Sequence, residues 1–196
     1  MKEITVSAIC TGGEDYKEAD KLVKLITAGS GVMNVLMKGV KKEKAKLKFA
    51  AMPFSFCEYT LLNAGGFYTV KNAVSQESLF DIAEDPDSYV CGSIILETAA
   101  IAMGGECAPD IFVFLLRALK LLIFSDIDAY SLTLNFVFRL LVRGGHCAAD
   151  EKNADYDCEI SVQESLVRAS AISVAKKFLK VFEEKYCCKI KSSMFL

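Results

Sequence analysis

A basic segment is the part of this 196-residue chain whose residue types point most directly to a chemistry. The stretch "KGVKKEKAKLKF" at positions 38–49 holds six lysines and one glutamate, although the net charge of the whole chain is only −2. Lysine carries a hydrated point charge that suits backbone phosphates without reading sequence. We therefore predict phosphate contact by the six lysines of this segment, Lys38, Lys41, Lys42, Lys44, Lys46 and Lys48. A solvated loop that only aids solubility is the alternative.

Aromatic residues lie within and just after the basic segment: Phe49, Phe54, Phe56 and Tyr59. In open β-barrels such rings often stack on the bases of single strands. The same rings could instead fill the core of a small barrel. The sequence leaves both interpretations open.

Residues able to bind a metal or to catalyse a reaction are few and poorly spaced. His146, Cys147, Asp157 and Cys158 flank a polar stretch at 148–157, but no C-x₂-C pair occurs anywhere, so we predict no metal site and no cofactor. There is one histidine, and no phosphate-binding or nucleophile-elbow motif. We predict no catalytic residue and no enzyme activity. A thiol or metal enzyme centred on His146 and Cys147 is an alternative.

The composition predicts a globular protein with two different halves. Hydrophobic residues make up 53% and charged residues 24%, the N-terminus lacks a signal-peptide pattern, and the most apolar stretch, 111–124, is too short to span a bilayer. We therefore expect a cytosolic protein whose eight cysteines are reduced. Residues 1–80 hold eleven lysines against eight acidic residues, whereas residues 81–196 hold twelve basic residues against seventeen acidic ones. Opposite charges suggest two units with different partners.

Periodicity indicates strands in the first half and helices in the second. Alternation and turn signals at Gly12-Gly13, Ala28–Gly31 and Gly65-Gly66 predict five strands, which suit an OB-type or SH3-like barrel: Glu3–Ala8, Asp20–Thr27, Val32–Lys38, Pro53–Leu62 and Phe67–Val74. Helices are predicted over 86–103, 109–124 and 127–142, and from a capping box at Ser161 and Glu164 to about residue 187. The last of these helices should face the core with Ile172, Ala175, Phe178, Leu179 and Phe182. The result is an α+β chain divided near residues 75–85.

Three stretches of the chain carry a likeness to a known family. The first is "YKEADKLVKLIT" at 16–27 followed by "GVMNVLMKGVKKEKAK" at 31–46; the others are "MPFSFCEYTL" at 52–61 and the C-terminal "FLKVFEEKYCCKIKSSMFL". Together these stretches resemble the bacterial RecO family of DNA repair proteins. They occur in the order and at the spacing found in the family. The resemblance implies an N-terminal five-stranded OB-fold barrel, residues 1–78, followed by an all-helical C-terminal domain, residues 79–196.

The resemblance also implies a function. Members of the family are non-enzymatic mediators of DNA repair and recombination that bind single- and double-stranded DNA, anneal complementary strands and help to load RecA. The implied partners are RecR and single-strand-binding protein, with RecA reached indirectly, and the implied location is the nucleoid-associated cytoplasm without membrane contact. DNA contact then falls on the six lysines and, as secondary candidates, on Lys21 and Lys24. A protein-interaction adaptor whose barrel has lost DNA binding is the alternative from another class.

The chain departs from the family pattern in two places. Many members carry a four-cysteine zinc module where this chain has only Cys147 and Cys158 around the 148–157 loop, so we do not carry the metal over. The basic segment holds lysines where relatives often include arginine. This difference predicts phosphate contact with weak sequence preference.

Overall fold

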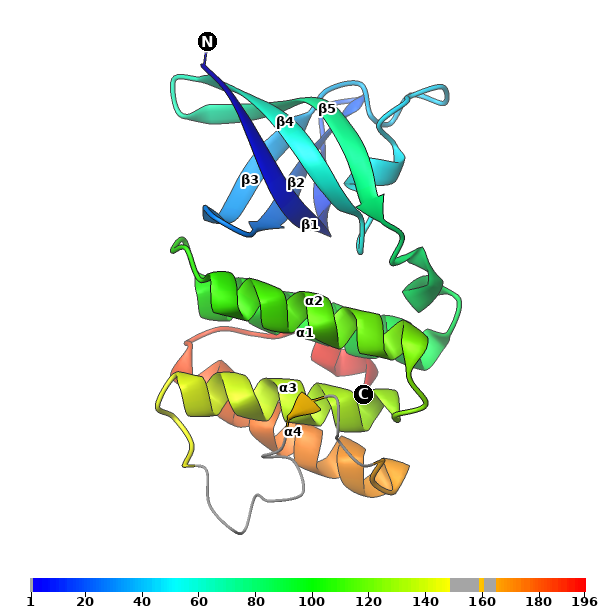
Figure 1. Ribbon diagram of the computed structural model, residues 1–196, viewed down its shortest axis with the longest axis vertical. Helices are drawn as coiled ribbons and strands as arrows, with labels where there is room; N and C mark the ends of the chain where they lie inside the picture. Colours follow the sequence, from blue (N-terminus) through cyan, green and yellow to red (C-terminus); the bar gives the residue numbers. More distant parts are fainter. Residues whose placement is uncertain (1, 149–158, 161–164) are drawn as a thin grey trace. The chain divides into compact units, whose positions relative to one another are not determined.

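The computed structural model describes residues 2–148, 159–160 and 165–196. Within these residues, five strands are followed by four α-helices, with short 3₁₀ helices between some of them (Figure 1). The predicted α+β class is confirmed. The chain divides into two compact units, Met1–Phe80 with Met103–Val113, and Asp81–Ala102 with Phe114–Leu196.

The five strands close into a barrel. They are β1 (Lys2–Tyr16), β2 (Asp20–Thr27), β3 (Gly31–Met37), β4 (Phe56–Ala64) and β5 (Phe67–Glu77), hydrogen-bonded in the order β1-β2-β3-β5-β4, and β4 pairs with β1 to close the ring. The β3–β5 pair is parallel and the others are antiparallel. This connectivity is that of an OB-fold, so the OB-type prediction is confirmed over the SH3-like one.

The interior of the barrel follows from the alternation of its strands. Along β3, Met33, Val35 and Met37 are buried, and from β2 the buried neighbours Val23 and Leu25 join the same core cluster. Successive side chains of a strand point to opposite faces, so every second residue of these strands faces outward. The barrel therefore presents a defined outer surface over β2 and β3.

The expected turn at Gly12-Gly13 is wrong. Strand β1 continues through these glycines to Tyr16, and its register with β2 shifts between Cys10 and Gly13 as in a β-bulge. Gly12 has φ +95°, and a Cβ on Gly13 would lie 2.3 Å from the Leu22 carbonyl oxygen. The two glycines therefore permit a kink and a close strand approach inside one long strand.

The helices are α1 (Pro86–Met103), α2 (Pro109–Phe124), α3 (Ala129–Arg143) and α4 (Arg168–Lys185). Two begin at aspartate caps: the backbone N–H of Ser88 donates to Asp85 and that of Ser131 donates to Asp128, each over 2.8 Å. A capping carboxylate satisfies an amide that has no partner within the helix. The first three helices begin and end within about two residues of their predicted limits.

The predicted start of the fourth helix is wrong. Ser161 and Glu164 lie outside the described residues, but the helix begins only at Arg168, because the residues just before it bond elsewhere. The N–H of Leu166 donates to Ser131 Oγ over 2.9 Å, and Val167 has ψ 123°, which is not helical. The predicted core face is otherwise correct, since Ala175, Phe178, Leu179 and Phe182 are buried and Ile172 is half-buried.

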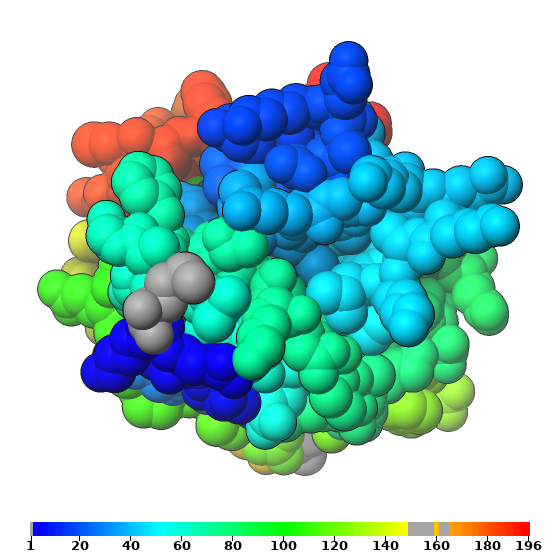
Figure 2. Space-filling model, turned by 90° about the horizontal axis from the view of Figure 1, so that it is seen from above, coloured from blue at the N-terminus to red at the C-terminus, as the bar shows by residue number. Residues whose placement is uncertain are grey.

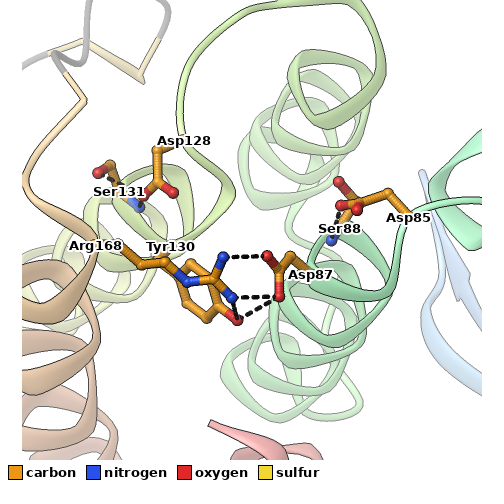
Figure 3. A network of polar contacts seen from close by, with 7 residues as sticks. All are labelled: Asp85, Asp87, Ser88, Asp128, Tyr130, Ser131 and Arg168. Carbon is orange, nitrogen blue, oxygen red and sulfur yellow. Dashed lines mark hydrogen bonds and ion pairs between the residues drawn. The ribbon is translucent and has the colours of Figure 1, made fainter.

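A polar network joins the first turns of α1, α3 and α4 (Figure 3). The guanidinium of Arg168 pairs with both carboxylate oxygens of Asp87 at 2.7 Å, and the hydroxyl of Tyr130 donates to Asp87 over 2.7 Å. The Arg168 guanidinium also lies 4.8 Å from the centroid of the Tyr130 ring. Burial and the bond to Asp87 raise the pKa of Tyr130. This bidentate pair fixes the start of α4 where a side-chain cap is absent.

None of the helices in the described part of the chain has the length and hydropathy needed to cross a bilayer. The seven described cysteines are free thiols, and Cys10, Cys57 and Cys91 are buried.

Candidate nucleic-acid interface

The predicted basic segment forms an ordered loop between β3 and β4, which we call the lysine loop (Lys38–Lys48). Two apolar side chains attach it to the barrel: Val40 is 3% exposed within the core cluster, and Leu47 packs against that cluster. The loop also bonds to the β1–β2 turn. The N–H of Gly39 donates to Asp20 Oδ1 over 2.7 Å, and that of Lys41 donates to the Ala19 carbonyl over 3.0 Å.

Successive turns hold the rest of the loop. The N–H of Lys42 donates to the Gly39 carbonyl, that of Ala45 to Lys42 and that of Lys48 to Ala45, over 3.0–3.3 Å. With Val40 and Leu47 turned inward, the lysine side chains face solvent. All six predicted lysines are exposed, and the loop, light blue to cyan in Figure 2, projects from one edge of the barrel.

One loop lysine is already paired. The ammonium of Lys41 lies 2.5 Å from a carboxylate oxygen of Asp15, near the end of β1, and this hydrogen bond lowers the pKa of the Asp15 carboxyl. The remaining loop lysines have no ion-pair partner among the described residues: Lys38, Lys42, Lys44, Lys46 and Lys48. Five unpaired ammonium groups on an ordered support are available to a polyanion.

The two secondary candidates are placed differently. Lys21 pairs in register with Asp15 and Met37 at the end of the barrel, where its charge also helps to lower the pKa of Asp15, so it adds to the positive rim beside the loop. Lys24 lies on the outer face of β2 opposite Asn34 and is exposed. The structure thus brings Lys21 to the loop and sets Lys24 apart on the adjoining face.

The four aromatic residues predicted either to stack on bases or to fill the barrel core differ in their burial. Phe54 and Tyr59 are 1% and 0% exposed, and the Tyr59 hydroxyl donates to the Ala50 carbonyl over 2.7 Å, so both belong to the core and cannot stack on a base. Phe49 is half-buried against the core cluster. Phe56 is also half-buried, and its ring centroid lies 6.2 Å from that of Phe112. Two of the four rings are therefore core residues, and the other two are only partly accessible.

One exposed aromatic residue near the loop was not among the residues predicted to stack on bases. Tyr16, the last residue of β1, is 45% exposed, and the ammonium of the next residue, Lys17, lies 5.4 Å from its ring centroid. The signal was present in the sequence as a tyrosine within "YKEADK", but strand register decides whether such a ring faces the core or the solvent.

The predicted absence of a metal site concerns residues that are only partly described. Asp157 and Cys158 lie outside the described residues. His146 is described, and its ring makes an edge contact with Tyr186 at 5.3 Å between centroids. Burial raises the pKa of the Cys147 thiol, which disfavours the reactive thiolate. Within the described ranges, no three His, Cys, Asp or Glu side chains are grouped as metal ligands would be.

Comparisons with known proteins identify the barrel. Residues 1–79 match the family described as "Recombination protein O N terminal". The chain is 30% identical over 134 residues to the DNA repair protein RecO of Clostridium novyi (strain NT), a match covering 68% of this chain and 52% of that protein. It is also 26% identical over 140 residues to the protein of that name from Clostridium kluyveri, covering 71% of this chain and 54% of the relative.

A third match has similar extent. The DNA repair protein RecO of Alkaliphilus metalliredigens (strain QYMF) is 24% identical over 131 residues, which cover 66% of this chain and 53% of that protein. The chain thus spans about half the length of the curated relatives it matches. The resemblance stated from the sequence is confirmed.

Proposed function

Since residues 1–79 match the family described as "Recombination protein O N terminal", we propose that this chain is a non-enzymatic mediator of DNA repair and recombination that binds DNA through the lysine loop. Its substrates are single- and double-stranded DNA, and its action is the annealing of complementary single strands. The residues that make contact are Lys38, Lys42, Lys44, Lys46 and Lys48, with Lys41 and Lys21 at the rim and Lys24 on the adjoining face of β2.

One observation supports this proposal above all: an OB-fold barrel carries an ordered loop with five exposed lysines that have no ion-pair partner among the described residues. Lysines near phosphates displace condensed counterions, and the release of these ions drives binding. Two strands repel one another through their phosphates, so a loop that neutralises phosphates on both lowers the barrier to base pairing. No chemical step is required.

The remaining parts of the proposal concern partners. Residues 1–78 act as the nucleic-acid-binding domain and residues 79–196, which are acidic overall, as a docking unit for RecR and for single-strand-binding protein. In this way the chain assists RecA on strands coated by single-strand-binding protein. It acts in the nucleoid-associated cytoplasm, without a metal or another cofactor.

An annealing assay tests the proposal. The triple variant Lys42→Glu, Lys44→Glu, Lys46→Glu reverses three exposed charges but leaves the Lys41 pair intact. We expect annealing of complementary oligonucleotides to collapse, while circular dichroism stays unchanged because these side chains face solvent. The matched control is Lys176→Glu, Lys177→Glu, Lys180→Glu, an equal charge change on exposed residues of α4, which should leave annealing intact.

The assay also separates the proposal from an adaptor. If the wild-type chain neither binds nor anneals DNA but still binds its protein partners, the barrel has lost DNA binding and the chain is an interaction adaptor. Equal loss of annealing in both triple variants would show that net charge, and not the loop, controls the activity.

A further inference from the structure

We propose that Tyr16, Leu22 and Leu36 form a platform on the outer face of the barrel that stacks on the unpaired bases of single-stranded DNA. This inference rests on the proposed function and deepens it, because it names the form of DNA that the lysine loop prefers. The bases of a duplex are stacked on one another and their faces are closed to side chains. A site with an open aromatic platform therefore favours single strands.

Strand register places the three side chains together. Tyr16 pairs with Asp20 across β1 and β2, and Leu22 pairs with Leu36 across β2 and β3. Residues directly opposite one another share a face, and the diagonal neighbour, here Leu22 beside Tyr16, lies about 7–8 Å away between Cα atoms. The neighbours Val23 and Val35 are buried in the barrel, so this face is the outer one.

All three side chains of the platform reach solvent. Tyr16 is 45% and Leu22 42% exposed, and Leu36 is half-buried. Large apolar side chains that adjoin one another on a strand surface make this face a candidate interaction site. The face of an aromatic ring is also suited to any base, which fits a site without sequence preference.

Two contacts tie the platform to the lysine loop. Asp15, the residue before Tyr16, pairs with Lys41, and Asp20, across the strand pair from Tyr16, accepts the hydrogen bond from Gly39 at 2.7 Å. The ring is thus one residue or one register position away from both anchors. A strand whose phosphates follow the loop would bring its bases to the ring.

Basic side chains lie along one side of the platform, where they could contact the phosphates of a bound strand. Lys17 reaches the Tyr16 ring at 5.4 Å, and its φ of +56° lies in the left-handed region, a costly conformation that often marks binding sites. Exposed Lys24 lies on β2 beyond Leu22. Two acids border the platform on the same outer face, because Glu14 lies directly opposite Leu22 and Asp20 directly opposite Tyr16. We therefore expect phosphates on the lysine side and bases over Tyr16.

An abasic strand separates stacking from charge. We would measure binding of the full chain to an oligothymidylate of about 20 nucleotides, longer than the roughly 4–16 nucleotides bound by one OB-fold, and to an abasic strand with the same number of phosphates. Wild type should bind the thymidylate about tenfold more tightly, the effect of about one stacked base. Tyr16→Leu should lose most of this preference with an unchanged salt slope, and Tyr16→Phe should keep it.

The outcomes distinguish the two proposals. If wild type binds neither strand, the proposed function fails. If it binds both strands equally, or if Tyr16→Leu keeps the preference for bases, the platform is overturned while DNA binding by the lysine loop stands. The comparison of strands on wild type requires no variant, so a misfolded variant cannot hide the answer. A supporting signal is quenching of tyrosine fluorescence, which is readable because the chain has no tryptophan.

Discussion

Neutralising three lysines of the loop should change how binding depends on salt in a calculable way. The variant is Lys42→Gln, Lys44→Gln, Lys46→Gln, in which glutamine keeps a polar, flexible side chain and removes only the charge. All three lysines are exposed and none has an ion-pair partner among the described residues, so the substitutions should leave the fold and its free energy of unfolding almost unchanged.

The magnitude follows from the number of phosphates contacted. If the five unpaired loop lysines each neutralise one phosphate, log K against log salt should have a slope of about −3.5 on single strands, at about −0.7 per contact. The triple variant should have a slope of about −1.4. Between about 50 and 200 mM salt, wild type should then lose affinity about 130-fold and the variant only about sevenfold.

Fluorescence anisotropy with a labelled oligothymidylate over a salt series measures both slopes. The matched control is Lys176→Gln, Lys177→Gln, Lys180→Gln, which removes the same charge from the exposed surface of α4 and should leave the slope of wild type. An unchanged slope in the loop variant would refute phosphate contact by these lysines. A parallel fall in both variants would attribute the effect to overall charge.

Three further predictions concern single residues. Gly31→Ala should destabilise the barrel in urea unfolding by at least about 1–3 kcal/mol, because Gly31 has φ +65° and a Cβ there would lie 2.5 Å from the Glu106 carbonyl oxygen. The control Gly29→Ala has open space around the added Cβ and should change the free energy of unfolding little; equal effects of the two substitutions would exclude the clash. Asp15→Asn should free Lys41 for a sixth phosphate and steepen the slope to about −4.2 on single strands; a slope that stays at the wild-type value would mean that this lysine never reaches DNA. Burial raises the pKa of the Cys10 thiol from its ordinary 9.0 to about 12, so between these values only the unfolded chain loses the proton, and the free energy of unfolding should fall with rising pH by up to about 1.4 kcal/mol per unit. Cys10→Ala should remove that part of the alkaline slope in urea titrations, and identical slopes would show that the thiol titrates normally in the fold.

Much of the fold could be predicted because its local signals agree with its tertiary structure. The Asp85-Pro86 cap and the glycines after α1 and α3 are satisfied by contacts close in sequence, and the alternation along β3 agrees with the side that faces the barrel core. The two failures arise where distant contacts decide. The Gly12-Gly13 pair alone predicts a turn, but the close approach of β2 makes it a β-bulge. In the same way, the hydrogen bond from Leu166 to Ser131 holds the residues before α4 outside the helix.

In the candidate site, the lysines could be predicted from the sequence, whereas the exposure of the aromatic residues could not. The charge of the lysine loop is a property of composition, so six residues could be named from the sequence alone. Whether an aromatic side chain faces the core or the solvent depends on register and on the residues packed around it. For that reason the sequence drew attention to Phe54 and Tyr59, which are core, and passed over Tyr16, which is exposed.

The order of the lysine loop bears on how its binding should be interpreted. Six like charges repel one another, but exposed charges interact by only about 0.2–1 kcal/mol per pair. Two apolar contacts oppose this repulsion: Val40 is buried, and full burial of a side chain of this size is worth about 1.5–3 kcal/mol, while Leu47 packs partly buried against the core cluster. The backbone bonds to Ala19 and Asp20 add to that. The loop is therefore held in place before any phosphate arrives, and binding does not have to supply the entropy of ordering it. This preorganisation should raise the affinity at every salt concentration, because little of the binding free energy is spent on ordering the loop, whereas the salt slope depends on the number of phosphates contacted.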